Sequence, residues 1–204
     1  MKMARSSEHG QEVCAVILAA GFSTRFGSDK LVSDMGGRTV LQRSVENVLG
    51  TSVDKVAVVV PNDGKLDNYL PSSVHRIYNP ERTGGISTSI AAGVNFFRNS
   101  ANGILLMVAD QPLVDSGTLD KLLSLFRENP SSIVACSVSG EIRNPMIFPA
   151  RLFGSLVSLK GDSGAKDLAL SWVGELKTVE VDPDKLMDVD TIDDLKQVLS
   201  LIRK

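Results

Sequence analysis

The chain has 204 residues, of which 43% are hydrophobic, and its 22 lysines and arginines against 24 aspartates and glutamates give a net charge of −2. This length and composition predict one large domain with enough apolar material for a sizeable core. The near-neutral charge argues against nucleic acid or anionic membrane surfaces as partners. No apolar run approaches the ~20 residues that a membrane span requires.

The N-terminal segment and the two cysteines indicate in which cellular compartment the protein works. Residues 1–12 are polar and lack the apolar segment of a secretory signal, so we expect a flexible tail over 1–12 and a single domain over 13–204. Cys14 and Cys136 lie inside apolar runs, where lone cysteines act as small core residues and form neither a disulfide framework nor a zinc motif. We therefore expect a cytoplasmic protein.

Strand-like and helix-like segments alternate along the chain. Apolar runs predict buried strands at residues 13–20, 56–60, 74–78, 104–109, 133–138 and 146–148. Apolar residues at helical spacing predict helices around residues 41–48, 90–97, 119–126, 165–172 and 195–202, the last capped by Thr191 with Asp194. Because strands without alternation are buried on both faces, helices must cover both sides of a mostly parallel sheet. The predicted fold is a three-layer α/β/α domain that binds ligands beyond the carboxyl ends of its strands.

The most informative segment, residues 18–30, directly follows the first predicted strand. Gly21 and Gly27 let the backbone approach an anion closely and turn N–H groups toward it. Arg25 adds a planar guanidinium and Lys30 a mobile ammonium, a combination that suits a polyphosphate. The glycine spacing matches neither the Walker A loop nor the dinucleotide-binding fingerprint, so the loop belongs to neither of those classes.

Two acidic segments are candidates for holding a metal ion. Asp110 follows the most hydrophobic strand, where a carboxylate inside the strand would be costly but one at its exit could hold a hard cation such as Mg²⁺. Asp190 is the second candidate and Asp188 its alternative, although an aspartate at a helix start also acts as an ordinary cap. We expect Lys30 and Asp110 to meet around a shared magnesium–triphosphate.

A third segment, residues 79–89, leads into the helix predicted at 90–97. Its glycines and hydroxyl side chains at a helix start offer N–H groups and space for a flat base and its ribose, and they are equally typical of a simple helix cap. The residues concerned are Asn79, Gly85, Ser87 and Ser89.

Together these segments resemble the MobA-like NTP transferase family. Residues 18–30 match its signature Leu-Ala-(Ala/Gly)-Gly-x-Ser-x-Arg-x-Gly-x-x-Lys, and residues 110–112 match its Asp-Gln-Pro motif. Residues 85–89, 144–148 and 161–168 resemble motifs of the subfamily that transfers nucleotides to the molybdenum cofactor. Two positions depart from that pattern, since Arg143 stands where glycine is expected and Lys166 replaces an arginine.

The resemblance implies a Rossmann-like, GT-A-type nucleotidyltransferase fold with a mostly parallel mixed sheet, and it assigns roles to particular residues. Nucleotide binding is implied for Leu18, Ala19, Ala20, Gly21, Ser23, Gly27, Asn79, Gly85, Ser87 and Ser89. Arg25 and Lys30 are implied to stabilise the leaving pyrophosphate, and Asp110 and Asp190 to bind Mg²⁺. Acceptor contacts are implied for Gln111, Asn144, Pro145, Asp162, Gly164 and Lys166.

The expected reaction is attack by a phosphate oxygen of the acceptor on the α-phosphorus of an NTP, with release of pyrophosphate. Because that nucleophile is already anionic, positioning and charge neutralisation do the work and no protein base is needed. Within the family, Ala20 and the Asp-Gln-Pro motif imply CTP as the nucleotide. The subfamily resemblance implies a molybdopterin-type cofactor as the acceptor, with a molybdenum hydroxylase receiving the product. Guanylyl transfer to the same cofactor, cytidylyl transfer to a sugar or polyol phosphate, and a non-catalytic cofactor carrier or chaperone remain as alternatives.

Overall fold

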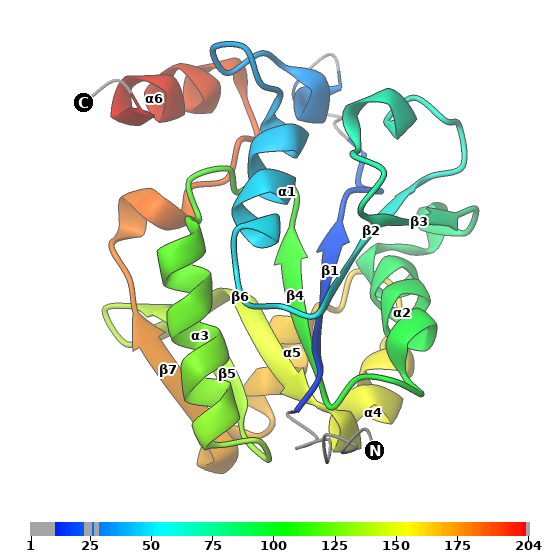
Figure 1. Cartoon of the computed structure of the whole chain (residues 1–204), viewed down its shortest axis with the longest axis vertical. Helices are drawn as coiled ribbons and strands as arrows, with labels where there is room; N and C mark the ends of the chain where they lie inside the picture. The colour runs from blue at the N-terminus through cyan, green and yellow to red at the C-terminus, as the bar shows by residue number, and fades with distance from the viewer. Residues whose placement is uncertain (1–10, 23–25, 27–28, 203–204) are drawn as a thin grey trace, which may run out of the picture.

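The structure is a computed structural model that describes residues 11–202 except 23–25 and 27–28. Within these residues, seven strands form one sheet in the order β3-β2-β1-β4-β6-β5-β7 (Figure 1). The strands are β1 (Val13–Leu18), β2 (Lys55–Pro61), β3 (His75–Asn79), β4 (Gly103–Val108), β5 (Ile133–Val138), β6 (Glu141–Pro149) and β7 (Leu176–Glu180). Only β6 runs antiparallel to its neighbours, β4 and β5, among these strands, so the sheet is mixed but mostly parallel.

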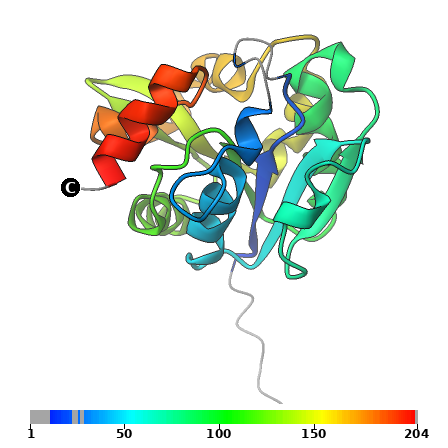
Figure 2. The ribbon, with the colours of Figure 1, turned by 90° about the horizontal axis from the view of Figure 1, so that it is seen from above.

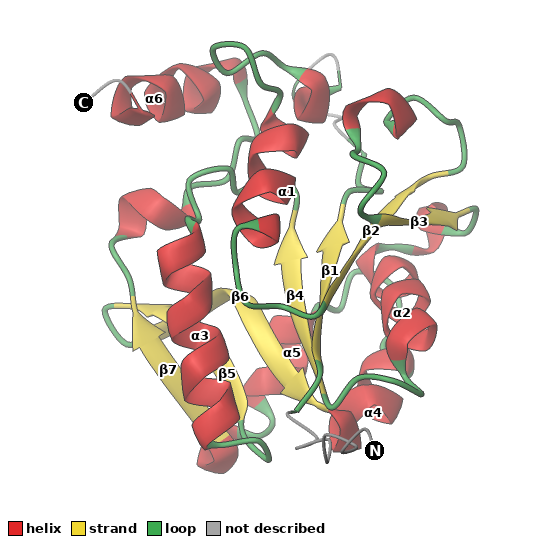
Figure 3. Ribbon diagram, in the orientation of Figure 1, coloured by secondary structure: helices red, strands yellow, loops and turns green. Residues whose placement is uncertain are grey.

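Helices cover both faces of this sheet, which makes three layers (Figures 2 and 3). The helices are α1 (Val40–Leu49), α2 (Ile86–Phe97), α3 (Ser116–Glu128), α4 (Phe153–Val157), α5 (Ala165–Leu170) and α6 (Ile192–Ile202). One core cluster joins α1, α3 and α6 to one face of the sheet, and a second joins α2, α4 and α5 to the other. The predicted three-layer α/β/α class is therefore confirmed.

Helix boundaries follow from local capping. The Thr39 side chain and Gln42 form a capping box at the start of α1, and the Asp115 side chain accepts the Thr118 N–H at the start of α3. The predicted cap of the last helix is confirmed, because the Thr191 hydroxyl accepts the backbone N–H of Asp194 at 3.2 Å. No helix in the described part of the chain combines the length and apolar character that a bilayer crossing needs.

Several predicted elements differ from the observed ones. The predicted strands are all present, but β6 begins at Glu141 rather than near residue 146. Strand β7 was not predicted from the sequence. Helix α5 ends at Leu170, so Trp172, assigned to that helical face from the sequence, lies beyond it. Cys14 and Cys136 are buried core residues as predicted, and desolvation raises the pKa of each thiol to about 12.

Candidate active site

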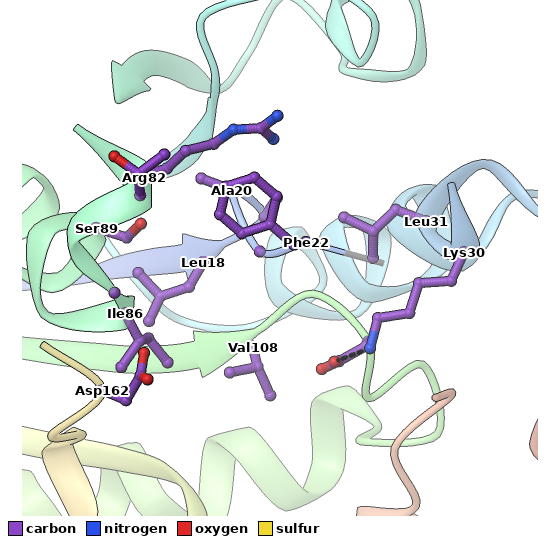
Figure 4. A pocket seen from close by; sticks show the side chains of 15 residues that line it. Leu18, Ala20, Phe22, Lys30, Leu31, Arg82, Ile86, Ser89, Val108 and Asp162 are labelled. Atoms are coloured by element: carbon purple, nitrogen blue, oxygen red, sulfur yellow. Dashed lines mark hydrogen bonds and ion pairs between the residues drawn. The ribbon is translucent and has the colours of Figure 1, made fainter. Parts of the chain in front are cut away.

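A cavity of about 590 Å³ lies where β1 and β4 end, at the edge of the sheet that collects the carboxyl ends of its parallel strands (Figure 4). Its lining comes from Leu18, Ala19, Ala20, Gly21 and Phe22, from Lys30 and Leu31, from Arg82, Thr83, Gly85, Ile86 and Ser89, and from Val108, Asp110 and Asp162. Loops that are far apart in the sequence thus surround one space large enough for a nucleotide.

Lys30 connects the first loop to the two acidic segments. Its Nζ donates to Asp110 Oδ2 at 2.6 Å and to Asp190 Oδ1 at 2.7 Å. Burial disfavours the ammonium, but the two carboxylates outweigh it, so the pKa of Lys30 lies above that of an ordinary lysine. The expected meeting of Lys30 and Asp110 is therefore present, and Lys30 is charged at neutral pH.

Local structure fixes where this ammonium lies. Lys30 opens a short 3₁₀ turn (Lys30–Val32) whose N–H at Leu31 is accepted by the Asp29 side chain at 3.2 Å. The Leu31 side chain is buried, which anchors the turn against the core. As a result, Lys30 extends into the cavity from a turn that is held at both its cap and its apolar side.

Hydrogen bonds hold the Asp110 loop from two sides. The Ser44 hydroxyl of α1 donates to the carbonyl of Ala109 at 2.8 Å. On the other side, the N–H of Val189 donates to the carbonyl of Asp110 at 2.9 Å, which ties the segment that carries Asp190 to the loop after β4. The two carboxylates are therefore brought together by the backbone as well as by Lys30.

The donor set suits a hard divalent cation. Asp110 Oδ1 is buried and has no hydrogen-bond partner within the described residues, so one acceptor oxygen is left for a further ligand. The described residues contain no group of three or more His, Cys, Asp or Glu side chains that could hold a metal by themselves. A pair of carboxylates is nevertheless what Mg²⁺ uses when substrate phosphates and water complete its coordination.

Asp188, the alternative second ligand, lies in the same acidic neighbourhood. Although the residue is partly exposed, desolvation of its carboxyl group, followed by the charges of Asp110 and Asp190, raises the pKa of Asp188 to about 6. This carboxyl group therefore titrates well above the ordinary aspartate value.

We expect Asp188→Asn to raise the melting temperature of the metal-free protein more at pH 7.5 than at pH 4.5. The folded-state pKa of about 6 exceeds the ordinary value of 3.8, so the folded protein holds the proton more tightly and stability falls as the pH rises between those values. Asparagine has no charge to repel the neighbouring carboxylates. Thermal unfolding in EDTA at the two pH values measures this difference, and an equal shift at both would contradict it.

The segment between β3 and α2 forms the opposite wall by close backbone packing. Gly85 has a φ of 90°, and a Cβ there would lie 2.3 Å from the carbonyl of Gly161. The N–H of Ser87 donates to that same carbonyl at 3.2 Å. Glycine is needed at position 85 because both its backbone angle and its contact with residue 161 exclude a side chain.

Two of the predicted nucleotide-binding residues, Asn79 and Ser89, stabilise this wall by hydrogen bonding to each other. Asn79 is buried, and its Nδ2 donates to the hydroxyl oxygens of Thr88 and Ser89, each at 2.9 Å. Ser89 lines the cavity, whereas Ser87 is buried and lies outside the cavity lining. The sequence-predicted residues Leu18, Ala19, Ala20, Gly21 and Gly85 also line the cavity, while Ser23, Arg25 and Gly27 lie outside the described residues.

The residues predicted to contact the acceptor fall into three places. Asp162 lines the main cavity. Asn144, Gly164 and Lys166 line a smaller adjoining cavity of about 60 Å³, next to the buried Pro145 and its cis peptide bond. Gln111 is buried and lies in neither cavity; its Nε2 donates to the carbonyl of Leu186 at 3.3 Å. The structure thus brings most of these residues to one side of the site but turns Gln111 toward the C-terminal segment.

Among the cavity residues that were not singled out from the sequence, Phe22 and Arg82 contact each other. Phe22 follows Gly21, and Arg82 begins the 3₁₀ turn before α2 (Arg82–Gly84). The Arg82 guanidinium carbon lies 4.4 Å from the centroid of the Phe22 ring. Phe22 occupies a variable position of the signature, and Arg82 precedes the motif at residues 85–89, so nothing in the local sequence marked either residue.

The fold and the site together define a class of protein: a three-layer domain in which the loop after β1, a lysine and the carboxylates that the lysine contacts meet at a nucleotide-sized cavity. Residues 15–176 match the MobA-like NTP transferase domain, and the chain belongs to this family. It is accordingly a nucleotidyltransferase, a transferase that acts on nucleoside triphosphates.

Individual relatives cover most of the chain. Purine catabolism protein PucB of Bacillus subtilis is 29% identical over 199 residues, which is 90% of this chain and 94% of that protein. The 3-deoxy-manno-octulosonate cytidylyltransferase of Flavobacterium johnsoniae is 33% identical over 136 residues, covering 65% of this chain and 54% of that protein.

Solved structures agree with this fold. The Rv0371c homologue from Mycobacterium sp. strain JC1 has a TM-score of 0.82 at 26% identity, covering 94% of this chain and 98% of that one. Rv0371c of Mycobacterium tuberculosis, solved in complex with manganese, has a TM-score of 0.79 at 24% identity, covering 93% of this chain and 98% of that one.

Proposed function

We propose that this chain is a Mg²⁺-dependent cytidylyltransferase that transfers CMP from CTP to a molybdopterin-type cofactor and releases pyrophosphate. The observation that carries the proposal is the convergence of Lys30, Asp110 and Asp190 at one end of the cavity, with Nζ–Oδ distances of 2.6 and 2.7 Å. A binding protein that only carried a cofactor would not need a cation and two carboxylates placed to expel pyrophosphate.

In this mechanism Asp110 and Asp190 would hold the divalent cation, which supplies charge neutralisation on the phosphates when it is bound. The backbone at residues 19–21 orients the triphosphate, and Lys30 donates to the oxygens of the departing pyrophosphate. The acceptor's phosphate oxygen is already anionic, so the chain needs no general base. Phosphoryl and nucleotidyl transfer then depend on positioning and on preorganised charge.

The proposed acceptor site is formed by Asn144, Gly164 and Lys166. These residues line the smaller cavity, which shares Leu18, Ile86 and Val108 with the main one. An acceptor seated there would extend toward the α-phosphate of a nucleotide in the main cavity. Lys166 would then present an ammonium to the acceptor where the family motif has an arginine.

A second candidate keeps the nucleotide and changes the acceptor. The relative from Flavobacterium johnsoniae is named as a cytidylyltransferase, which favours CTP, and its name specifies a sugar acid as the acceptor. Such a sugar-type acceptor favours cytidylyl transfer to a sugar or polyol phosphate as the alternative to a molybdopterin acceptor.

The test compares CTP, GTP, ATP and UTP with Mg²⁺ present. A ligand that binds only the folded state raises the melting temperature, so we expect CTP to give the largest shift. We also expect pyrophosphate release from CTP only when molybdopterin is added. The largest shift with GTP would indicate guanylyl transfer, release with a sugar phosphate alone would favour the second candidate, and molybdopterin binding without release would indicate a carrier.

A further inference from the structure

Phe22 and Arg82 form a contact across the cavity that the proposed mechanism does not use. Phe22 belongs to the loop after β1, and Arg82 belongs to the loop between β3 and α2; both line the cavity. Figure 4 shows Arg82 reaching over the ring of Phe22, with 4.4 Å between its guanidinium carbon and the ring centroid. Phe22 is 52% exposed, so it is not a core residue.

The charges around the cavity show why this arginine is distinctive. Among the described lining residues the cations are Lys30 and Arg82, and the two carboxylates that Lys30 contacts already balance its charge. Arg82 makes no ion pair and no side-chain hydrogen bond within the described part of the chain; its contact is with the Phe22 ring face. A contact with a ring face uses none of the N–H donors of a guanidinium, so these donors are left for a ligand.

We propose that Arg82, held over the ring of Phe22, binds a phosphate group of a substrate in this cavity through two parallel N–H donors. A planar guanidinium fits phosphate in this bidentate way, whereas an ammonium contacts it as a point charge. Among the described residues that line the two cavities, Arg82 is the only arginine. The smaller cavity, on the acceptor side, has Lys166 as its cation. The proposal rests on the cavity being the nucleotidyltransferase site, but not on CTP or on a particular acceptor.

Phe22 acts here as a positioning residue. The cation–π contact restricts the long Arg82 side chain before a ligand arrives, so less conformational freedom is lost on binding. It also joins the two loops that face each other across the cavity. The phosphate could come from the nucleotide or from the acceptor, and the two sources are separable by experiment.

The experiment compares Arg82→Gln, Arg82→Lys and Phe22→Leu in the full chain. Calorimetry with Mg²⁺ measures the binding of CTP, GTP and inorganic pyrophosphate, and steady-state kinetics measures the KM for the acceptor. We expect Arg82→Gln to weaken binding of its phosphate ligand by about tenfold or more, as the loss of a charge-assisted hydrogen bond does. Arg82→Lys should recover only part of this loss. Phe22→Leu should weaken binding less, and should add nothing further in the Arg82→Gln background.

Arg98→Gln is the matched control, because Arg98 follows α2, is exposed, and lies outside the cavity lining. It removes the same charge and should leave all of these values unchanged. Weaker binding of CTP, GTP and pyrophosphate together would assign Arg82 to the nucleotide, and a raised acceptor KM alone would assign it to the acceptor. If every value stays within twofold of wild type, the proposal is wrong. The pyrophosphate arm holds even if another nucleotide replaces CTP, so the two proposals fail separately.

Discussion

Lys30→Met is expected to slow pyrophosphate release by about 10²–10³-fold, the usual cost of removing one preorganised charge donor from a transition state. The same change is expected to tighten the binding of Mn²⁺ to the nucleotide-free protein. The Lys30 ammonium contacts both Asp110 and Asp190, at 2.6 and 2.7 Å. A divalent cation that uses these carboxylates must compete with it, and methionine fills a similar volume without the charge.

The two effects are measured separately, the first by kcat and the second by electron paramagnetic resonance of free Mn²⁺. Lys185→Met is the matched control, because Lys185 pairs with Asp115 at 2.5 Å, outside the cavity lining. That variant should leave both quantities unchanged. A loss of turnover below threefold would place Lys30 outside the reaction, and weaker Mn²⁺ binding would mean that Lys30 supports the fold of the acidic site instead of competing for it.

The central strands were predictable because their burial leaves a simple pattern. β1, β2 and β4 are continuous apolar runs, and such runs exist only where helices cover both faces of a sheet. β7 carried no such pattern: Leu176–Glu180 is a short edge strand whose charged residues, Lys177 and Glu180, are exposed. The early part of β6 was missed for a related reason, since its first residues apart from Ile142 are polar and burial is continuous only from Pro145 onward.

The site was predictable where a motif fixed both residue type and spacing, and it was not where contact is made in three dimensions only. The carboxyl ends of parallel strands share one edge of the sheet, which is why Lys30 and Asp110 could be expected to meet. The direct contact of Lys30 with Asp190 spans 160 positions and has no local signal. The Arg82–Phe22 contact is of the same kind, and so is the turning of Gln111 toward Leu186 rather than toward a cavity.

Asp110→Asn is expected to reduce metal-dependent turnover by at least about a thousandfold while leaving the fold intact. The substitution keeps the side-chain size and the backbone hydrogen bonds of the loop, but it removes the carboxylate whose Oδ1 has no partner among the described residues. A metal ion contributes several kcal/mol of transition-state stabilisation, and each ~1.4 kcal/mol is a factor of ten in rate. Titration of turnover with Mg²⁺, alongside circular dichroism, measures both parts of the expectation.

A control variant and variants of the two candidate second ligands complete this test. Asp120→Asn makes the same chemical change on α3, where the carboxylate accepts from Ser52 outside the cavity lining, and should not alter the Mg²⁺ dependence. Asp190→Asn and Asp188→Asn then separate the two candidates for the second ligand. Asp110 and Asp190 both contact the Lys30 ammonium, so their carboxylates lie close enough to share a metal ion. We therefore expect Asp190→Asn to weaken Mn²⁺ binding more than Asp188→Asn does. Near-normal Mg²⁺ dependence in Asp110→Asn would exclude this acidic pair as the metal site, whatever the second ligand.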